Sequence, residues 1–190
     1  MTKTQNKRIF GKAKQRADRT RALVNRNRLA LKLVMPGVAP QQAYGHQVNG
    51  ASASQTQGMR VNIKRATHFG GSQACLTTVI AWLFGPVADP GVRNYCEQLD
   101  MWVTTWAKMD PTDRRETRRT WALAVGEILL GKTSTCTKGP IEATIAALMH
   151  LGWMPSTPDV WVISSSTSVR LDGKVYTRFQ ILAKAQHDAQ

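Results

Sequence analysis

Cys75 and His68 are two residues whose types could support a reaction, because a histidine base can activate a cysteine thiol as a nucleophile. The surrounding residues argue against that chemistry. Ser72 is a suitable helix N-cap, and the apolar residues that follow recur at helical spacing over 73–84. A helix beginning at Ser72 would bury Cys75 among apolar neighbours. We therefore expect a structural cysteine and keep a cysteine hydrolase as a third hypothesis.

Acidic residues could instead hold a pair of Mg²⁺ ions, as two-metal nucleases and polymerases require. The chain has only 12 Asp and Glu residues and no Asp-Asp pair. Asp89 and Asp110 each precede a proline, as helix N-caps do, and Asp172 precedes a glycine, as turn residues do. We therefore predict no catalytic residue, no metal site and no cofactor. This chain alone is not expected to be an enzyme.

Cationic side chains point to a polyanionic partner. The first 34 residues carry 11 of the 26 Lys and Arg residues and one acid, Asp18, so this segment holds +10 of the net charge of +14. Such a block binds nucleic acid by neutralising phosphates and releasing counterions. Two shorter basic groups follow, one near residue 60 and one near residue 115. The predicted nucleic-acid contacts are Lys3, Lys7, Arg8, Lys12, Lys14, Arg16, Arg19, Arg21, Arg26, Arg28, Lys32, Arg60, Lys64, Arg65, Arg114, Arg115, Arg118 and Arg119.

Two features leave alternatives open. The arginines at 114–119 fit a solvated helix face as well as a second phosphate contact. The six tryptophans could stack unpaired bases or fill a core. Helical spacing favours packing for Trp102, Trp106 and Trp121, and we also favour packing for Trp153 and Trp161, which flank a loop.

Periodicity and turn residues predict a mainly α fold. Helices are expected over 15–34, from Ser54 or Thr56 to Thr67, over 73–84, after Asp89-Pro90, after Asp110-Pro111 and after Gly139-Pro140. The last three form a small antiparallel bundle. Alternation over 159–164 and 168–182 predicts strands, with a hairpin turn at Asp172-Gly173. The expected organisation is a basic arm at 1–34, a linker at 35–57, a helical domain at 58–158 and a β-hairpin tail at 159–190. The helix over 15–34 is expected to be half disordered without nucleic acid.

The compartment is predicted to be intracellular, either nuclear or cytoplasmic. Cys75, Cys96 and Cys136 are odd in number and widely spaced, which suits reduced thiols. The longest nearly apolar run, 77–88, is shorter than the roughly 20 residues that a bilayer span needs, so no membrane association is expected. An organelle transit peptide is the alternative interpretation of the acid-poor N-terminus.

Glycine, proline and tryptophan residues between about Val34 and Trp161 form a broader pattern. Its elements are Tyr44-Gly45, Gly50, the helix from Met59-Arg60 to Ala66-Thr67, Gly71-Ser72-Gln73-Ala74-Cys75, Asp89-Pro90, Gly139-Pro140-Ile141, Leu151-Gly152-Trp153, Pro155 and Trp161. This pattern resembles a segment of protist non-LTR retrotransposon polyproteins, between the reverse transcriptase palm and ribonuclease H. The resemblance implies a thumb or connection region that grips a template and primer duplex by its backbone. The paired palm aspartates and the acidic ribonuclease H residues are absent, so no catalytic residue carries over.

The leading hypothesis is therefore a non-catalytic nucleic-acid-binding protein that resembles this connection region. The runner-up is a structural RNA-binding protein, capsid-like or ribosome-associated, whose basic arm threads into RNA. Phosphate contacts do not distinguish RNA from DNA, so that choice, sequence specificity and the oligomeric state stay open.

Overall fold

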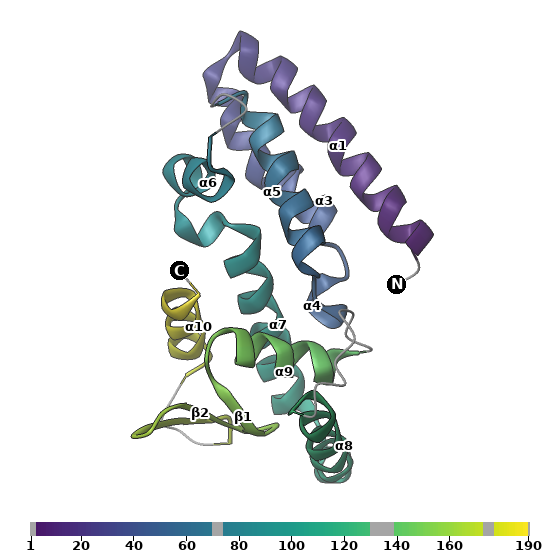
Figure 1. Ribbon diagram of the computed structural model, residues 1–190, viewed down its shortest axis with the longest axis vertical. Coiled ribbons are helices and arrows are strands. Elements are labelled where there is room, and N and C mark those ends of the chain that lie inside the picture. Colours follow the sequence, from purple (N-terminus) through teal and green to yellow (C-terminus); the bar gives the residue numbers. More distant parts are fainter. Residues whose placement is uncertain (1–2, 70–73, 130–138, 173–176, 190) are drawn as a thin grey trace. The chain divides into compact units, whose positions relative to one another are not determined.

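The computed structural model describes residues 3–69, 74–129, 139–172 and 177–189 of the 190. The chain is mainly α-helical with one small antiparallel sheet (Figure 1), which confirms the predicted fold class. It divides into two compact units. Unit 1 comprises Met1–Gly45 and Ala51–Arg93, and unit 2 comprises His46–Gly50 and Asn94–Gln190. No helix in the described part of the chain combines the length and apolarity needed to cross a bilayer.

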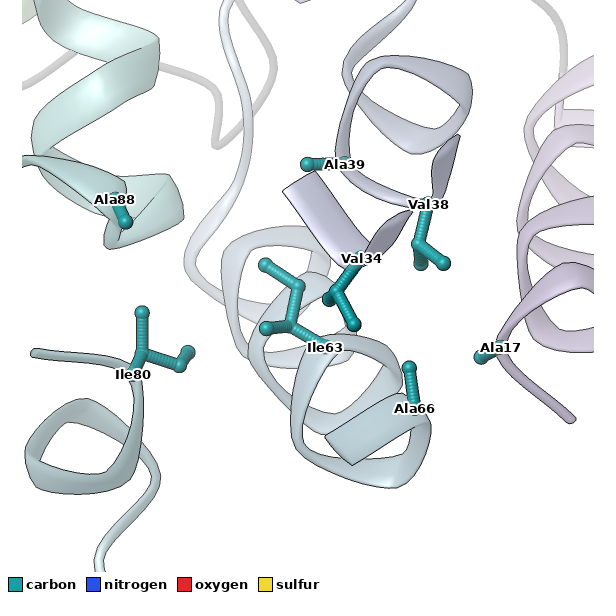
Figure 2. Close-up of a cluster of buried hydrophobic side chains, with 8 residues drawn as sticks. All are labelled: Ala17, Val34, Val38, Ala39, Ile63, Ala66, Ile80 and Ala88. Atoms are coloured by element: carbon teal, nitrogen blue, oxygen red, sulfur yellow. The ribbon is translucent and has the colours of Figure 1, made fainter. Parts of the chain in front are cut away.

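Unit 1 is built around a long N-terminal helix. Its elements are α1 (Lys3–Arg26), the 3-10 helix η1 (Arg28–Leu33), α2 (Val34–Gly37), α3 (Ala39–Ala43), α5 (Ala53–Thr67), α6 (Leu76–Phe84) and the 3-10 helix η2 (Pro86–Ala88), followed by the first turn of α7 (Pro90–Lys108). Helix α1 runs alongside α5 (Figure 1). Six of these elements contribute to one apolar cluster (Figure 2). Its members are Ala17, Val34, Val38, Ala39, Ile63, Ala66, Ile80 and Ala88.

The inner face of α1 is a stripe of small or short side chains. Ala13, Ala17, Thr20 and Val24 recur at intervals of 4, 3 and 4 residues, and all four are buried. Gly58 on α5 supports the same contact, since a Cβ there would lie only 3.2 Å from the Phe10 ring. A helix is present as predicted, but its predicted bounds of 15–34 are wrong and it is packed rather than half disordered. The helix begins at Lys3, ends at Arg26 and packs on α5.

The predicted linker at 35–57 is also wrong, because much of it is folded. Gln42 on α3 is buried, and its side chain accepts a hydrogen bond from Asn62 Nδ2 at 3.2 Å and donates one to the Met59 carbonyl at 3.2 Å. Helix α5 begins after Ser52, which forms a capping box with Gln55, rather than after Ser54 or Thr56. The folded segment is thus fixed to α5 by polar as well as apolar contacts.

The three proline-led helices occur where the sequence predicts them. Helix α7 follows Asp89, α8 (Pro111–Leu129) follows Asp110, and α9 (Pro140–His150) follows Gly139. The Asp110 carboxylate accepts hydrogen bonds from the Thr112 and Asp113 amides at 2.8 and 2.9 Å, as an N-cap does. After α9, Gly152 adopts a left-handed φ of 75°, the conformation in which a glycine commonly ends a helix.

The C-terminal part of unit 2 contains a sheet and a helix. Strands β1 (Met154–Thr157), β2 (Val160–Ser164) and β3 (Thr167–Arg170) pair antiparallel in the order β1-β2-β3, with Trp161 opposite Val169. The predicted small β element is present. Its strands are joined by turns at 158–159 and 165–166 rather than at the predicted position. Gly173 of the predicted Asp172-Gly173 turn lies outside the described residues. Residues 178–182, predicted as strand, belong to helix α10 (Arg178–Asp188), so that prediction is wrong.

Five tryptophans form the core of unit 2. Trp102, Trp106, Trp121, Trp153 and Trp161 are each at most 4% exposed, so the preference for packing is confirmed. Four indole N–H groups donate hydrogen bonds across this core. The acceptors are Pro158 O for Trp102 (2.8 Å), Asp172 Oδ1 for Trp106 (3.0 Å), Pro155 O for Trp121 (3.0 Å) and Asp188 Oδ2 for Trp153 (2.9 Å). The Trp161 indole nitrogen is buried without a partner among the described residues.

His46 gives unit 2 a predicted sensitivity to acid. It lies on α4 (His46–Asn49), it is 3% exposed, and its Nδ1 atom has no hydrogen-bond partner in the described part of the chain. Burial lowers the pKa of His46 from its ordinary value of 6.5, against a smaller raising effect of Glu97. The unfolded chain therefore binds a proton that the folded chain does not, between pH 6.5 and the lower folded pKa.

Unit 2 is accordingly expected to lose stability as the pH falls below 6.5, and a His46→Asn variant is expected to show a flatter dependence. Urea unfolding of both proteins, measured from pH 7.5 down to about pH 5, compares the two curves. Parallel curves would contradict the prediction.

Candidate nucleic-acid interface

The outer face of α1 carries a straight row of cations. Arg8, Lys12, Arg19 and Arg26 are spaced by 4, 7 and 7 residues, so at about 100° per residue they fall on one line along the helix. That line lies opposite the buried stripe of Ala13, Ala17, Thr20 and Val24. The row is about 27 Å long at 1.5 Å per residue. We call these four residues the cation row.

The cation row belongs to a larger set of predicted cations in the first 34 residues. Every one whose side chain is described is exposed, namely Arg8, Lys12, Lys14, Arg16, Arg19, Arg21, Arg26, Arg28 and Lys32. The side chains of Lys3 and Lys7 lie outside the described part of the structure. No hydrogen bond or ion pair joins a cation-row side chain to another described residue. These four charges are therefore available to an external anion.

Two flanking arginines are held by the protein itself. Arg16 donates to the Gly37 carbonyl at 3.3 Å, and Arg21 Nε donates to His68 Nδ1 at 3.0 Å. Asp18, the one acid of this segment, forms an ion pair with Arg65 on α5. The pair neutralises both charges locally. The field of the α1 surface is therefore set by cations alone.

A hollow of about 490 Å³ lies at the C-terminal end of the cation row. Arg26 and Arg28 line one part of it, and His68 and Phe69, which follow α5, line another. His68 adopts a left-handed backbone with φ of 56°, uncommon for a residue other than glycine. The hollow thus combines two cations, an imidazole and an aromatic ring.

The predicted contacts on α5 have internal partners. Arg60 forms a two-point ion pair with Asp89, with Nε to Oδ2 at 2.8 Å and Nη2 to Oδ1 at 2.7 Å. Lys64 Nζ donates to the Ala74 carbonyl at 3.1 Å. With Arg65 on Asp18, the sequence-predicted group at 60–65 is engaged in holding unit 1 together. We leave these three residues out of the contact surface proposed below.

The four arginines between positions 114 and 119 form two pairs, one with internal partners and one exposed on α8. Arg114 Nη1 donates to Asp172 at 3.0 Å, and Arg118 Nη2 donates to Asp159 at 2.9 Å. Each guanidinium carbon also lies 5.2 Å from the centre of the Trp106 ring, a cation-π distance. Arg115 and Arg119 are exposed and pair with no other described residue. Two of these four arginines therefore remain available to a ligand.

Asp159 is held in its charged form by this network. Burial alone would raise the pKa of the Asp159 carboxyl, but the hydrogen bond and charge of Arg118, with the Thr157 hydroxyl, outweigh burial and keep that pKa below its ordinary value. The sequence pattern predicts Asp172 only as a turn residue, and Asp159 lies in the turn at 158–159. Their second role, as anchors for arginines on α8, has no local sequence signal.

Trp82 differs from the other tryptophans and was not assigned a role from sequence. It lies on α6 and is 71% exposed. Its ring packs edge to face on Phe69, with centroids 5.3 Å apart at 62°. Phe69 in turn lines the hollow beside Arg26. The apolar spacing over 73–84 predicts a buried helix face, and Ile80 is buried as this spacing predicts. Trp82 does not fit the spacing, which is the only indication of its exposure in the sequence.

Cys75 is exposed, so the prediction that a helix buries it is wrong. Helix α6 begins one residue later, at Leu76, and Cys75 Sγ lies 3.1 Å from Thr77 Oγ1. Hydrogen bonds from Thr77 and then Thr78 lower the pKa of this thiol to about 6. No hydrogen bond links Cys75 to a histidine among the described residues, and His68 Nδ1 is occupied by Arg21. Cys75 is therefore an exposed thiol with a lowered pKa, and no histidine base pairs with it among the described residues.

Alkylation is expected to separate Cys75 from Cys96. Cys96 is buried, which raises its pKa to about 11. Iodoacetamide should modify Cys75 with a rate that rises through about pH 6 and leave Cys96 unmodified in the folded protein. Peptide mass spectrometry resolves the two sites, and Thr77→Val should move the Cys75 profile to higher pH. Equal labelling of both cysteines at pH 7 would contradict this assignment.

The described residues contain no cluster of potential metal ligands. No three His, Cys, Asp or Glu side chains of the described residues lie close enough together to hold an ion. Comparisons with known proteins add no assignment: no protein-family model matches the chain, and neither a curated protein nor a solved structure is significantly similar to it.

Proposed function

We propose that this chain is a non-catalytic nucleic-acid-binding protein that holds the sugar-phosphate backbone along the cation row of α1. The observation that carries the proposal is the division of α1 into two faces. Its inner stripe is fixed on α5, and its outer face presents Arg8, Lys12, Arg19 and Arg26 with no internal partner among the described residues. A row of fixed, unpaired cations suits a regular line of phosphates.

The packing of α1 favours this hypothesis over a free arm that threads into RNA. A threading arm folds when it binds and pays an ordering cost at that moment. Helix α1 is already ordered by its own core contacts. A preordered surface suits a protein that grips a strand or duplex from one side. This is also what the resemblance to a retroelement connection region implies, and we retain that role, inside the cell, as part of the proposal.

The test is the salt dependence of binding to a duplex of random sequence. The variant Arg8→Gln, Lys12→Gln, Arg19→Gln, Arg26→Gln removes the cation row without touching the core. Each lost phosphate contact should make the slope of log K against log salt shallower by about 0.9, so the full variant should lose about three to four units of slope.

A comparison variant of equal charge removes four exposed cations of unit 2, two of them the unpaired arginines of α8, with the changes Lys108→Gln, Arg115→Gln, Arg119→Gln and Arg170→Gln. Both variants lose the same net charge. A smaller change of slope in the control assigns the effect to the row rather than to charge alone. Equal slopes in the two variants, or no binding by the unmodified protein at low salt, would contradict the proposal. Deletion of 1–34 is a poorer test, because it also removes Ala17 and Val34 from the core.

A further inference from the structure

The hollow beside Arg26 has the size and the polar groups of a nucleotide site. Its volume of about 490 Å³ falls within the range of small-molecule pockets, about 300 to 1,000 Å³. Arg26 belongs both to the cation row and to the wall of this hollow. A backbone that follows the row is therefore led directly to the hollow. Arg28, which is also exposed, adds a second cation for one phosphate group.

His68 supplies a hydrogen-bond donor to the same space. Its Nδ1 atom accepts from Arg21, so its ring hydrogen is on Nε2, which has no partner in the described part of the chain. The left-handed backbone at His68 holds the ring at the end of α5, on the wall of the hollow. Such an uncommon conformation in a residue with a side chain occurs often at ligand sites.

An aromatic platform extends from the hollow. Phe69 lines it, and Trp82 packs against Phe69 with most of its surface exposed. The other five tryptophans of the chain are buried, so Trp82 is a large apolar surface left uncovered in a chain that otherwise hides its indoles. Cations beside exposed aromatic rings are the combination with which proteins bind unpaired nucleotides, whose bases stack on the rings.

We infer that the hollow and Trp82 together receive an unpaired nucleotide of a bound strand. Its phosphate lies against Arg26 and Arg28, and its base stacks on the exposed Trp82 ring, which packs edge to face on Phe69. A base inside a duplex has no free face to offer, so this site selects single-stranded RNA or DNA. The inference rests on the proposed function and adds to it a preference that the cation row alone does not give.

The test compares Trp82→Ala with the unmodified protein on three probes of equal length: oligouridine, oligothymidine and a blunt duplex. Loss of one stacked base should weaken single-strand binding by about tenfold or more and leave duplex binding unchanged. The salt slope should stay the same, because stacking releases no counterions. Oligouridine and oligothymidine distinguish RNA from DNA as the source of the nucleotide.

Three further variants sharpen the result. Trp82→Phe keeps a ring and should retain most of the affinity. Phe179→Ala removes an aromatic side chain that is 80% exposed in unit 2 and should change nothing. Arg26→Gln with Arg28→Gln should make the single-strand slope shallower by about 0.7, because both arginines contact one phosphate. The opposite pattern, a change of slope in Trp82→Ala, would overturn the stacking role.

Two outcomes separate failure of this inference from failure of the proposed function. If the unmodified protein binds nucleic acid and Trp82→Ala has no effect, or weakens duplex binding equally, only the nucleotide site is wrong. If the unmodified protein binds none of the three probes at low salt, both are wrong. Circular dichroism of each variant confirms folding, which the exposure of Trp82 should leave intact.

Discussion

Asp89→Ala is expected to cost unit 1 about 3 to 5 kcal/mol of unfolding free energy. The Asp89 carboxylate is 9% exposed and accepts hydrogen bonds from two Arg60 nitrogens and from the Gly91 amide at 2.8 Å. It therefore pairs a cation on α5 and caps α7 with the same two oxygens. Removal of the carboxylate takes a two-point ion pair from the Arg60 guanidinium, which is 25% exposed, and takes the cap from the helix.

Asp110→Ala is the matched control, because Asp110 also precedes a proline and caps a helix but lies exposed. Loss of a cap alone costs about 1 kcal/mol. Urea unfolding followed by circular dichroism measures both variants. A double change, Arg60→Met with Asp89→Leu, should cost less than the sum of the single Arg60→Met and Asp89→Leu changes, since it leaves no stranded charge. Similar costs for Asp89→Ala and Asp110→Ala would show that the ion pair adds nothing.

Trp121→Ala is expected to cost unit 2 about 3 to 5 kcal/mol. Trp121 is 1% exposed, packs on Trp102 with ring centroids 5.1 Å apart, and donates to the Pro155 carbonyl. The change removes a large buried side chain and leaves a cavity between α8 and β1. It also leaves the Pro155 carbonyl without the hydrogen bond from the indole. The unfolding midpoint in urea should fall with little change in slope.

Two conservative changes isolate the indole hydrogen bond. Trp121→Phe keeps a ring and strands the Pro155 carbonyl, at a cost of about 1 to 3 kcal/mol for the unpaired acceptor. Trp161→Phe removes an indole N–H that has no partner among the described residues, so it should cost less than Trp121→Phe. The reverse order of the two costs would contradict the role given to this bond.

The parts of the fold that follow from sequence are those with local signals. Asp89-Pro90, Asp110-Pro111 and Gly139-Pro140 fix helix starts through the geometry of a few neighbouring residues. Helix α1 has no such signal. Its inner stripe is largely Ala and Thr, which gives weak apolar periodicity, and its partner Gly58 lies on a different helix. Charge density therefore suggested an unpacked arm where the chain forms a packed helix.

The candidate site shows the same limit. Composition alone identified the cations, but their partners are distant in sequence: Arg60 and Asp89 are 29 residues apart, and Arg118 and Asp159 are 41 apart. The tertiary structure therefore determines which of the cations form ion pairs. Trp82 and the hollow beside Arg26 were missed for the same reason, since Phe69 joins them only in the folded chain.

The two faces of α1 also bear on how this protein can change over time. Core residues and cation-row residues occupy opposite sides of one helix, so a substitution at Lys12 or Arg19 leaves the buried stripe untouched. Affinity for polyanions and folding stability can then drift independently, one charge at a time. An engineer has the same freedom, and a graded series of α1 variants would provide one scaffold with a range of ionic-strength optima.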